Sequence, residues 1–197
     1  KGMALYRTLF YVPSIVPTIA SAMLWLWILN PQFGLANEIL RQLGLPTIGW
    51  IASPRWSKPS LILMDLWGVG NAIVIYLAGL QDVPESLYEA AELDGATALR
   101  KTWHITIPML TPVIFFNVVM GLIGASQYFT QAYVMTRGGP LDSTLFYALL
   151  IYRNAFNYFK MGLASAMSWL LFLIVLALTL LLFRSSGRWV YYGGAMR

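Results

Sequence analysis

Four long apolar stretches, separated by more polar segments, organise the chain. A helix that crosses a membrane needs about 20 mostly apolar residues, and residues 9–29, 60–80, 110–131 and 161–183 each meet that requirement. The fourth stretch contains no charged residue, whereas the second contains one, Asp65. The pattern predicts an all-α protein in which four helices span a bilayer.

The segments between these stretches are too long for tight helix hairpins. Residues 35–43 predict a short helix among turn-forming proline pairs. Residues 145–159, which follow the turn Arg137-Gly138-Gly139-Pro140, are rich in aromatic side chains and predict an interfacial helix that is broken at Arg153. Segment 81–108 differs from both because it carries five of the eight acidic residues, which are Asp82, Glu85, Glu89, Glu92 and Asp94.

Composition supports a membrane protein and excludes several kinds of chemistry. The chain is 58% hydrophobic and only 11% charged, whereas a soluble domain carries about 25% charged residues. It has no cysteine and one histidine, His104, so a thiolate or multi-histidine metal site is excluded. The net charge of +5 is spread over every polar segment, which argues against nucleic acid as a partner and fits a protein beside anionic membrane lipid.

The acidic segment 81–108 predicts two short helices. Asp82 and Glu85 have the spacing of a capping box, and a helix over 83–93 should end at Gly95. Asp94 is expected to cap a second helix that runs toward Pro108. Ala90 and Ala91 give the first helix a small-residue face, on which another protein could dock. A solvated loop helix is the alternative, because a helix of about ten residues is marginal alone in water.

The same segment resembles a known motif. Glu89-Ala90-Ala91 and Asp94-Gly95-Ala96, followed by Ile105 and Pro108, are similar to the EAA loop of ABC-importer permeases, in particular the carbohydrate type. Asn30-Pro31, Gly34 with Asn37, and the Arg137–Pro140 turn resemble further segments of these permeases. Thr102 departs from the pattern, because the family commonly has an aromatic residue there.

The resemblance implies a fold, partners and a location. The fold would be the type I ABC-importer transmembrane domain, a single domain over residues 1–197, with a core of about six spans of which the N-terminal part is missing here. The loop would lie in the cytoplasm, with both ends of this chain, and its helices would couple to an ATPase. The partners would be a second homologous permease, a dimer of ATPase subunits that bind ATP and magnesium, and an external solute-binding protein. This chain would be a transport subunit of the bacterial inner membrane, with no cofactor and no enzymatic activity of its own.

Two stripes of small, aromatic and amide residues flank the acidic segment. Met64, Trp67, Gly68 and Asn71 have the i, i+3, i+4, i+7 spacing of one helical face, and Gly121, Gly124, Ala125 and Tyr128 repeat it. In maltose-type permeases the sugar site lies on the helices that flank the loop, which implies that these stripes form part of a substrate path. Ordinary packing of small residues between helices is the alternative.

Other features leave open questions. Asp65 is expected to pair structurally rather than bind substrate, and His104 with Ser126 lacks the acid that a hydrolase would need. Basic residues divide seven against six between the two sides, so they do not fix the orientation. The nearest alternative functions are a related permease for glycerol phosphate or another small solute, and an ion-coupled secondary transporter.

Overall fold

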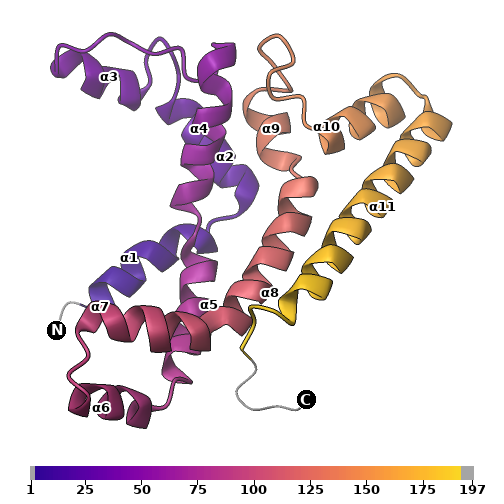
Figure 1. The fold of residues 1–197 in the computed structure, drawn as a ribbon. Helices are drawn as coiled ribbons and strands as arrows, with labels where there is room; N and C mark the ends of the chain where they lie inside the picture. Colours follow the sequence, from indigo (N-terminus) through magenta and orange to yellow (C-terminus); the bar gives the residue numbers. More distant parts are fainter. Residues whose placement is uncertain (1–2, 192–197) are drawn as a thin grey trace. The chain divides into compact units, whose positions relative to one another are not determined.

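The computed structural model describes residues 3–191, and these residues form helices and loops without a strand, which confirms the all-α prediction. The helices fall into two compact units, each described separately below. The first comprises α1 (Met3–Ile15), α2 (Thr18–Ile28), α3 (Leu35–Gln42), α4 (Pro54–Trp67), α9 (Thr130–Met135), α10 (Tyr147–Tyr152) with the π-helical turn η2 (Arg153–Asn157), and the first part of α11 (Met161–Ser186). The second comprises nearly all of α5 (Gly70–Gln81) and α8 (Ile107–Ser126), all of α6 (Glu85–Leu93), α7 (Ala98–Lys101) and the π-helical turn η1 (Thr102–Thr106), and the rest of α11 (Figure 1).

Two of the four predicted spans coincide with candidate spans of the structure, although α8 ends at Ser126 and α9 begins at Thr130 inside the third predicted span, 110–131. Met161–Ser186 and the helical run Ala98–Met135 are long and apolar enough to cross a membrane. The other two predicted spans are helix pairs, α1 with α2 and α4 with α5, so that the described residues hold two candidate spans, or four if each pair counts as one.

The first predicted span, 9–29, is bent rather than straight. The axes of α1 and α2 differ by 100°, and the break falls immediately before Pro17. Proline disfavours the helical conformation in the residue that precedes it and donates no backbone hydrogen bond. A single straight helix over 9–29 is therefore wrong, although its apolar composition is that of a spanning segment.

The second predicted span, 60–80, is interrupted at Gly68 and Val69. The helix α4 ends at Trp67 and α5 begins at Gly70. Two glycines around a β-branched valine form a weak helical sequence. A Cβ at Gly70 would collide with the backbone carbonyl of Phe10 in α1, so glycine permits this close approach of α1.

The first unit has a core between α2, α4, α9 and α10. Its buried members are Ala22, Leu29, Leu61, Met64, Ala132, Met135 and Leu149. An aromatic cluster extends this core, because Tyr152 of α10 packs against both Phe129 and Tyr133 with ring centroids 5.1 and 5.2 Å apart. This core holds α4 beside the segment that contains Tyr128.

In the second unit, α8 packs against α5 and the end of α11. The side chains of Leu110 and Val113 fill the space over Gly79. The Phe115 ring meets Phe183 edge to face with centroids 4.9 Å apart, and the Thr111 hydroxyl accepts a hydrogen bond of 2.7 Å from the Tyr191 backbone N–H. Thus this unit anchors the segment that carries α6 and α7.

Candidate functional site

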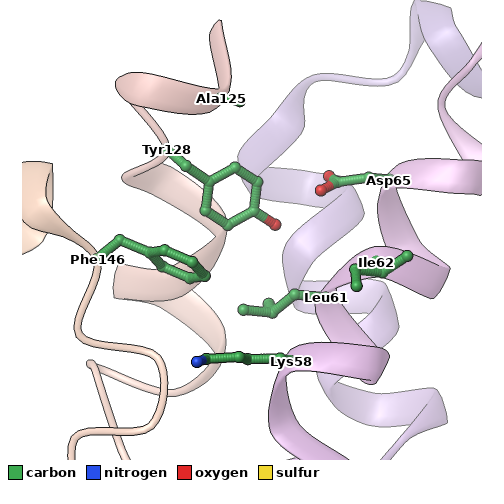
Figure 2. A pocket seen from close by; sticks show the side chains of 7 residues that line it. All are labelled: Lys58, Leu61, Ile62, Asp65, Ala125, Tyr128 and Phe146. Carbon is green, nitrogen blue, oxygen red and sulfur yellow. The ribbon is translucent and has the colours of Figure 1, made fainter. Parts of the chain in front are cut away.

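A pocket of about 220 Å³ lies within the first unit. The helix α4 supplies one wall and the segment around Tyr128, with Phe146, supplies the other (Figure 2). The lining residues are Lys58, Leu61, Ile62, Asp65, Ala125, Tyr128 and Phe146. The four from α4 have the i, i+3, i+4, i+7 spacing of one helical face, so a single face of α4 forms this wall.

The two walls differ in chemistry. Leu61 and Ile62 present aliphatic groups, whereas the rings of Tyr128 and Phe146 meet edge to face with centroids 5.0 Å apart. Asp65 lies at one end, where Gln131 Nε2 donates a hydrogen bond of 3.4 Å to its Oδ1. The Tyr128 hydroxyl points toward the same carboxylate (Figure 2). An aromatic surface beside hydrogen-bonding groups is the usual make-up of a small-molecule site.

The predicted stripes are only partly brought together. Ala125 and Tyr128 line the pocket, but Met64 is buried in the core and Trp67 packs edge to face on Trp25 of α2, with centroids 6.1 Å apart. Because α4 ends at Trp67, Gly68 follows the helix rather than continuing its face.

The predicted face also crosses a unit boundary. Asn71, Gly121 and Gly124 belong to the second unit, whereas Met64 and Tyr128 belong to the first. A Cβ added at Gly121 or Gly124 would meet no atom within 4 Å, so neither glycine is needed for packing inside the described chain. The single continuous face predicted over Met64–Asn71 is therefore wrong, because the helix breaks within it.

Sequence reasoning missed four pocket residues: Lys58, Leu61, Ile62 and Phe146. The first three precede Asp65 at helical spacing, and counting back from that intramembrane acid would have found them. Nothing in the local sequence around Phe146 connects it to α4, because the contact depends on the packing of the unit.

The Gly34–Asn37 segment stabilises the loop that follows α2. Asn37 has no exposed surface, and its Oδ1 accepts hydrogen bonds of 3.0 Å from the backbone N–H of Ile48 and from Trp50 Nε1. Its Nδ2 donates to the carbonyls of Pro31 and Ile48 at 3.0 and 2.9 Å. Gly34 lies against the Asn30 backbone, where a Cβ would not fit. The motif therefore ties α3 to the loop that leads into α4.

The Arg137–Pro140 turn is held by Arg153, the first residue of η2. Arg153 Nη2 donates to the Arg137 carbonyl, and Arg153 Nη1 lies 3.2 Å from Asp142 Oδ1. The helix continues through Arg153 as the π-helical turn η2. The prediction that Arg153 breaks the helix is wrong, because its guanidinium is satisfied by this turn.

The predicted coupling segment consists of two helices joined at Gly95. Helix α6 ends at Leu93, and Gly95 has a φ of +71°, a left-handed conformation that glycine adopts without strain. This confirms glycine as the stop signal. On α6, Glu89 and Ala90 are exposed and Ala91 is half-buried. Asp94 is exposed and Ala96 half-buried beyond the helix, while Leu93, which the sequence argument did not single out, is 92% exposed.

The predicted caps of these helices are wrong. The N-cap of α6 is Pro84, without a side-chain hydrogen bond, so Asp82 and Glu85 form no capping box. Thr97 rather than Asp94 caps α7, and its Oγ1 accepts a hydrogen bond of 3.4 Å from the Arg100 backbone N–H. Gly95 and Ala96 separate Asp94 from the N-cap Thr97, so α7 begins only at Ala98.

Two contacts brace α6 against the helix that follows. Lys101 Nζ lies 2.6 Å from Glu92 Oε1, and the Tyr88 hydroxyl lies 2.9 Å from Thr106 Oγ1. The hydrogen bond from Lys101, aided by its positive charge, lowers the pKa of Glu92. These contacts therefore tie α6 to α7 and to η1, which continues directly into α8.

Apolar helices long enough to span a membrane, a small pocket and a braced pair of polar helices are features expected of a membrane transport subunit. Residues 2–188 match the family described as "Binding-protein-dependent transport system inner membrane component", and the chain belongs to this family. This places it among the inner membrane components of binding-protein-dependent transport systems and confirms the resemblance seen in the EAA segment.

The relatives and a solved structure agree with this assignment. The chain is 46% identical over 196 residues to the probable ABC transporter permease protein YesP of Bacillus subtilis, covering 98% of this chain and 63% of that protein. It is 37% identical to the trehalose/maltose transport system permease protein MalF of Thermococcus litoralis, with 91% and 61% covered. The crystal structure of a bacterial ABC transporter involved in the import of the acidic polysaccharide alginate superposes with a TM-score of 0.87 at 25% identity, covering 94% of this chain and 65% of that one. The chain thus spans less than two thirds of the length of these proteins.

Proposed function

We propose that this chain forms part of the translocation path of an ATP-driven importer for a sugar or oligosaccharide. The observation that carries the proposal is the braced EAA segment, in which α6 and α7 are joined at Gly95. The Lys101–Glu92 contact ties α6 to α7, and the Tyr88–Thr106 contact ties α6 to η1. A pair of helices fixed in this way can move as one body, which is what coupling to another protein requires.

The docking surface would be the exposed part of α6 and the turn after it. Glu89 and Ala90 are exposed there and Leu93 extends into solvent, so the α6 surface offers a small residue and a strongly exposed apolar side chain. An apolar group at the centre of an interface contributes most when a partner buries it. The partner would be a dimer of ATPase subunits that bind ATP and magnesium, and the segment would face the cytoplasm.

The substrate side of the proposal centres on the pocket. Tyr128 and Phe146 offer an aromatic surface to a sugar ring. Asp65, which is expected from the sequence only to pair structurally, accepts a hydrogen bond from Gln131, and its carboxylate can accept further hydrogen bonds from sugar hydroxyl groups. Ala125 leaves room beside them. We keep Asn71, Gly121 and Gly124 as candidate path residues, whereas the buried position of Met64 and the packing of Trp67 favour structural roles for those two.

The names of the relatives favour a saccharide. They include permeases of trehalose/maltose, lactose and sulfoquinovosyl glycerol transport systems. A permease of an sn-glycerol-3-phosphate transport system is 34% identical, so glycerol phosphate is the second candidate. An alginate transporter has been solved in complex with a periplasmic protein carrying alginate pentasaccharide, and we propose a second permease and an external solute-binding protein as further partners here.

Purification of the intact transporter tests this proposal. We expect an ATPase subunit and a second permease to co-purify with the chain, and a sugar with its binding protein to stimulate ATP hydrolysis. Competition of labelled sugar uptake by excess glycerol phosphate separates the two substrate candidates. Stimulation by glycerol phosphate but by no sugar would overturn the saccharide assignment and leave the coupling proposal standing.

A further inference from the structure

The pocket in the first unit carries opposite charges at its two ends. Lys58 and Asp65 lie two turns apart on the same face of α4, with Leu61 and Ile62 between them. Figure 2 shows the Lys58 side chain extending from α4 toward the opposite wall, below Phe146, while Asp65 faces Tyr128 above it. A ligand in this space therefore meets a cation at one end and an anion at the other.

Asp65 has a hydrogen-bond partner within the described part of the protein, whereas Lys58 has none there. Asp65 accepts a hydrogen bond from Gln131, and the Tyr128 hydroxyl points toward it. Lys58 takes part in none of the ion pairs or hydrogen bonds found across residues 3–191. A cation beside an apolar wall gains most from a ligand that brings a negative charge.

Resting on the proposed import function, we infer that the pocket selects a saccharide unit that bears a carboxylate, such as a uronic acid. The Lys58 ammonium binds the carboxylate, and Asp65 accepts hydrogen bonds from hydroxyl groups at the far end of the sugar. The Tyr128 and Phe146 rings pack on its apolar face. Each group of such a sugar then meets a side chain of matching chemistry.

An anionic lipid headgroup is the other source of negative charge near a membrane helix. Its acyl chains would have to continue past the headgroup along an apolar surface, but the end of the pocket opposite Lys58 carries the Asp65 carboxylate, which accepts a hydrogen bond from the Gln131 amide. Those groups suit sugar hydroxyls and are unfavourable for hydrocarbon. The pocket therefore fits the saccharide better than the lipid.

The test compares Lys58→Gln, Lys58→Arg and wild type in the intact transporter, reconstituted with its ATPase and binding protein. The probes are two labelled disaccharides of the same stereochemistry, cellobiouronate, which carries one carboxylate, and neutral cellobiose, together with a panel of other uronate and neutral pairs. Every variant uses the same binding protein, so the preference of that protein affects all variants equally. A difference between variants in the ratio of acidic to neutral uptake therefore comes from the permease. Arg55→Gln serves as the matched control, since Arg55 is an exposed cation on the same helix outside the pocket lining.

We expect Lys58→Gln to lower uptake of the acidic saccharide about tenfold, the loss of one charge-assisted contact, with neutral uptake changed less than twofold. Lys58→Arg and Arg55→Gln should retain the wild-type ratio. Equal loss of both saccharides, no loss of either, or a wild type that imports only neutral sugars would overturn the inference while leaving sugar import intact. Loss of co-purified anionic lipid from Lys58→Gln without a change in the uptake ratio would assign Lys58 to the lipid. Failure of wild type to import any saccharide would instead overturn the proposed function.

Discussion

Replacing Asn37 by leucine should open the segment between α2 and α4. The substitution keeps the approximate size of the side chain but removes all four hydrogen bonds that Asn37 makes with Pro31, Ile48 and Trp50. Asn37 is fully buried, so leucine would lie among the polar groups of a site shaped for an amide, and its own hydrophobic burial would offset only part of this loss.

The loss of stability in Asn37→Leu comes from the hydrogen-bonding groups that the substitution leaves without partners. The Ile48 N–H and the Trp50 Nε1–H each lose their acceptor, and a buried donor without a partner costs about 1–3 kcal/mol. Carbonyl oxygens tolerate the loss better than N–H groups. Ile48 and Trp50 are half-buried, so water recovers part of the cost, and the net loss should be about 2–4 kcal/mol.

Hydrogen exchange of the Ile48 amide measures this directly. A loss of about 2–4 kcal/mol corresponds to exchange about 30- to 900-fold faster in peptides that contain residue 48. Gln42→Leu, on the exposed side of the same helix, is the control and should leave the exchange unchanged. If Ile48 exchanges at the wild-type rate in Asn37→Leu, Asn37 does not hold this segment and the reasoning is refuted.

Three further predictions concern the coupling segment and the topology. Gly95→Trp should abolish sugar-stimulated ATP hydrolysis without affecting membrane insertion, since a side chain at this left-handed turn is strained and its bulk would separate the docked surfaces; retained stimulation would exclude docking at this turn. A cysteine at Thr97 should react with a membrane-impermeant reagent only from the cytoplasmic side and one at Gly139 only from outside, and the reverse labelling would overturn the orientation. The ion pair with Lys101 lowers the pKa of Glu92, so its stabilising effect is present above the ordinary carboxyl pKa and is lost as the pH falls through the lowered value. The difference in melting temperature between wild type and Lys101→Met should therefore shrink in acid, and a difference that grows in acid would contradict the assignment.

The sequence predicts best where one physical signal dominates. The long charge-free stretch 161–183 lies within a single helix, Met161–Ser186, because nothing in it competes with helix formation in a membrane. Gly95 ends α6, the first helix of the EAA segment, as expected, since few other residues adopt its left-handed conformation without cost. Asn37 shows a limit, because the motif was visible but its partners, Ile48 and Trp50, come from a loop with no periodicity.

The failures have identifiable causes as well. Average hydrophobicity over 9–29 hides Pro17, whose effect on the backbone outweighs the apolar run around it. The stripe through Met64 and Asn71 assumed an unbroken helix, and a break of two residues at Gly68 and Val69 shifts the register of everything beyond it. Phe146 reaches the pocket only through packing of the first unit, so no local pattern marks it.

The positions of both chain ends relative to the membrane remain predictions, because residues 1–2 and 192–197 lie outside the part that the structure describes. Their placement in the cytoplasm depends on the orientation of the coupling segment. The cysteine labelling at Thr97 and Gly139 therefore tests the location of the ends indirectly.

Uptake of a labelled saccharide into proteoliposomes that contain the complete transporter shows whether ATP hydrolysis on a partner drives a sugar past this chain. With binding protein and sugar on one side and ATP with magnesium on the other, we expect accumulation that requires ATP and continues when proton and sodium gradients are collapsed. Accumulation that needs an ion gradient and proceeds without ATP would contradict this expectation, and would identify an ion-coupled transporter instead.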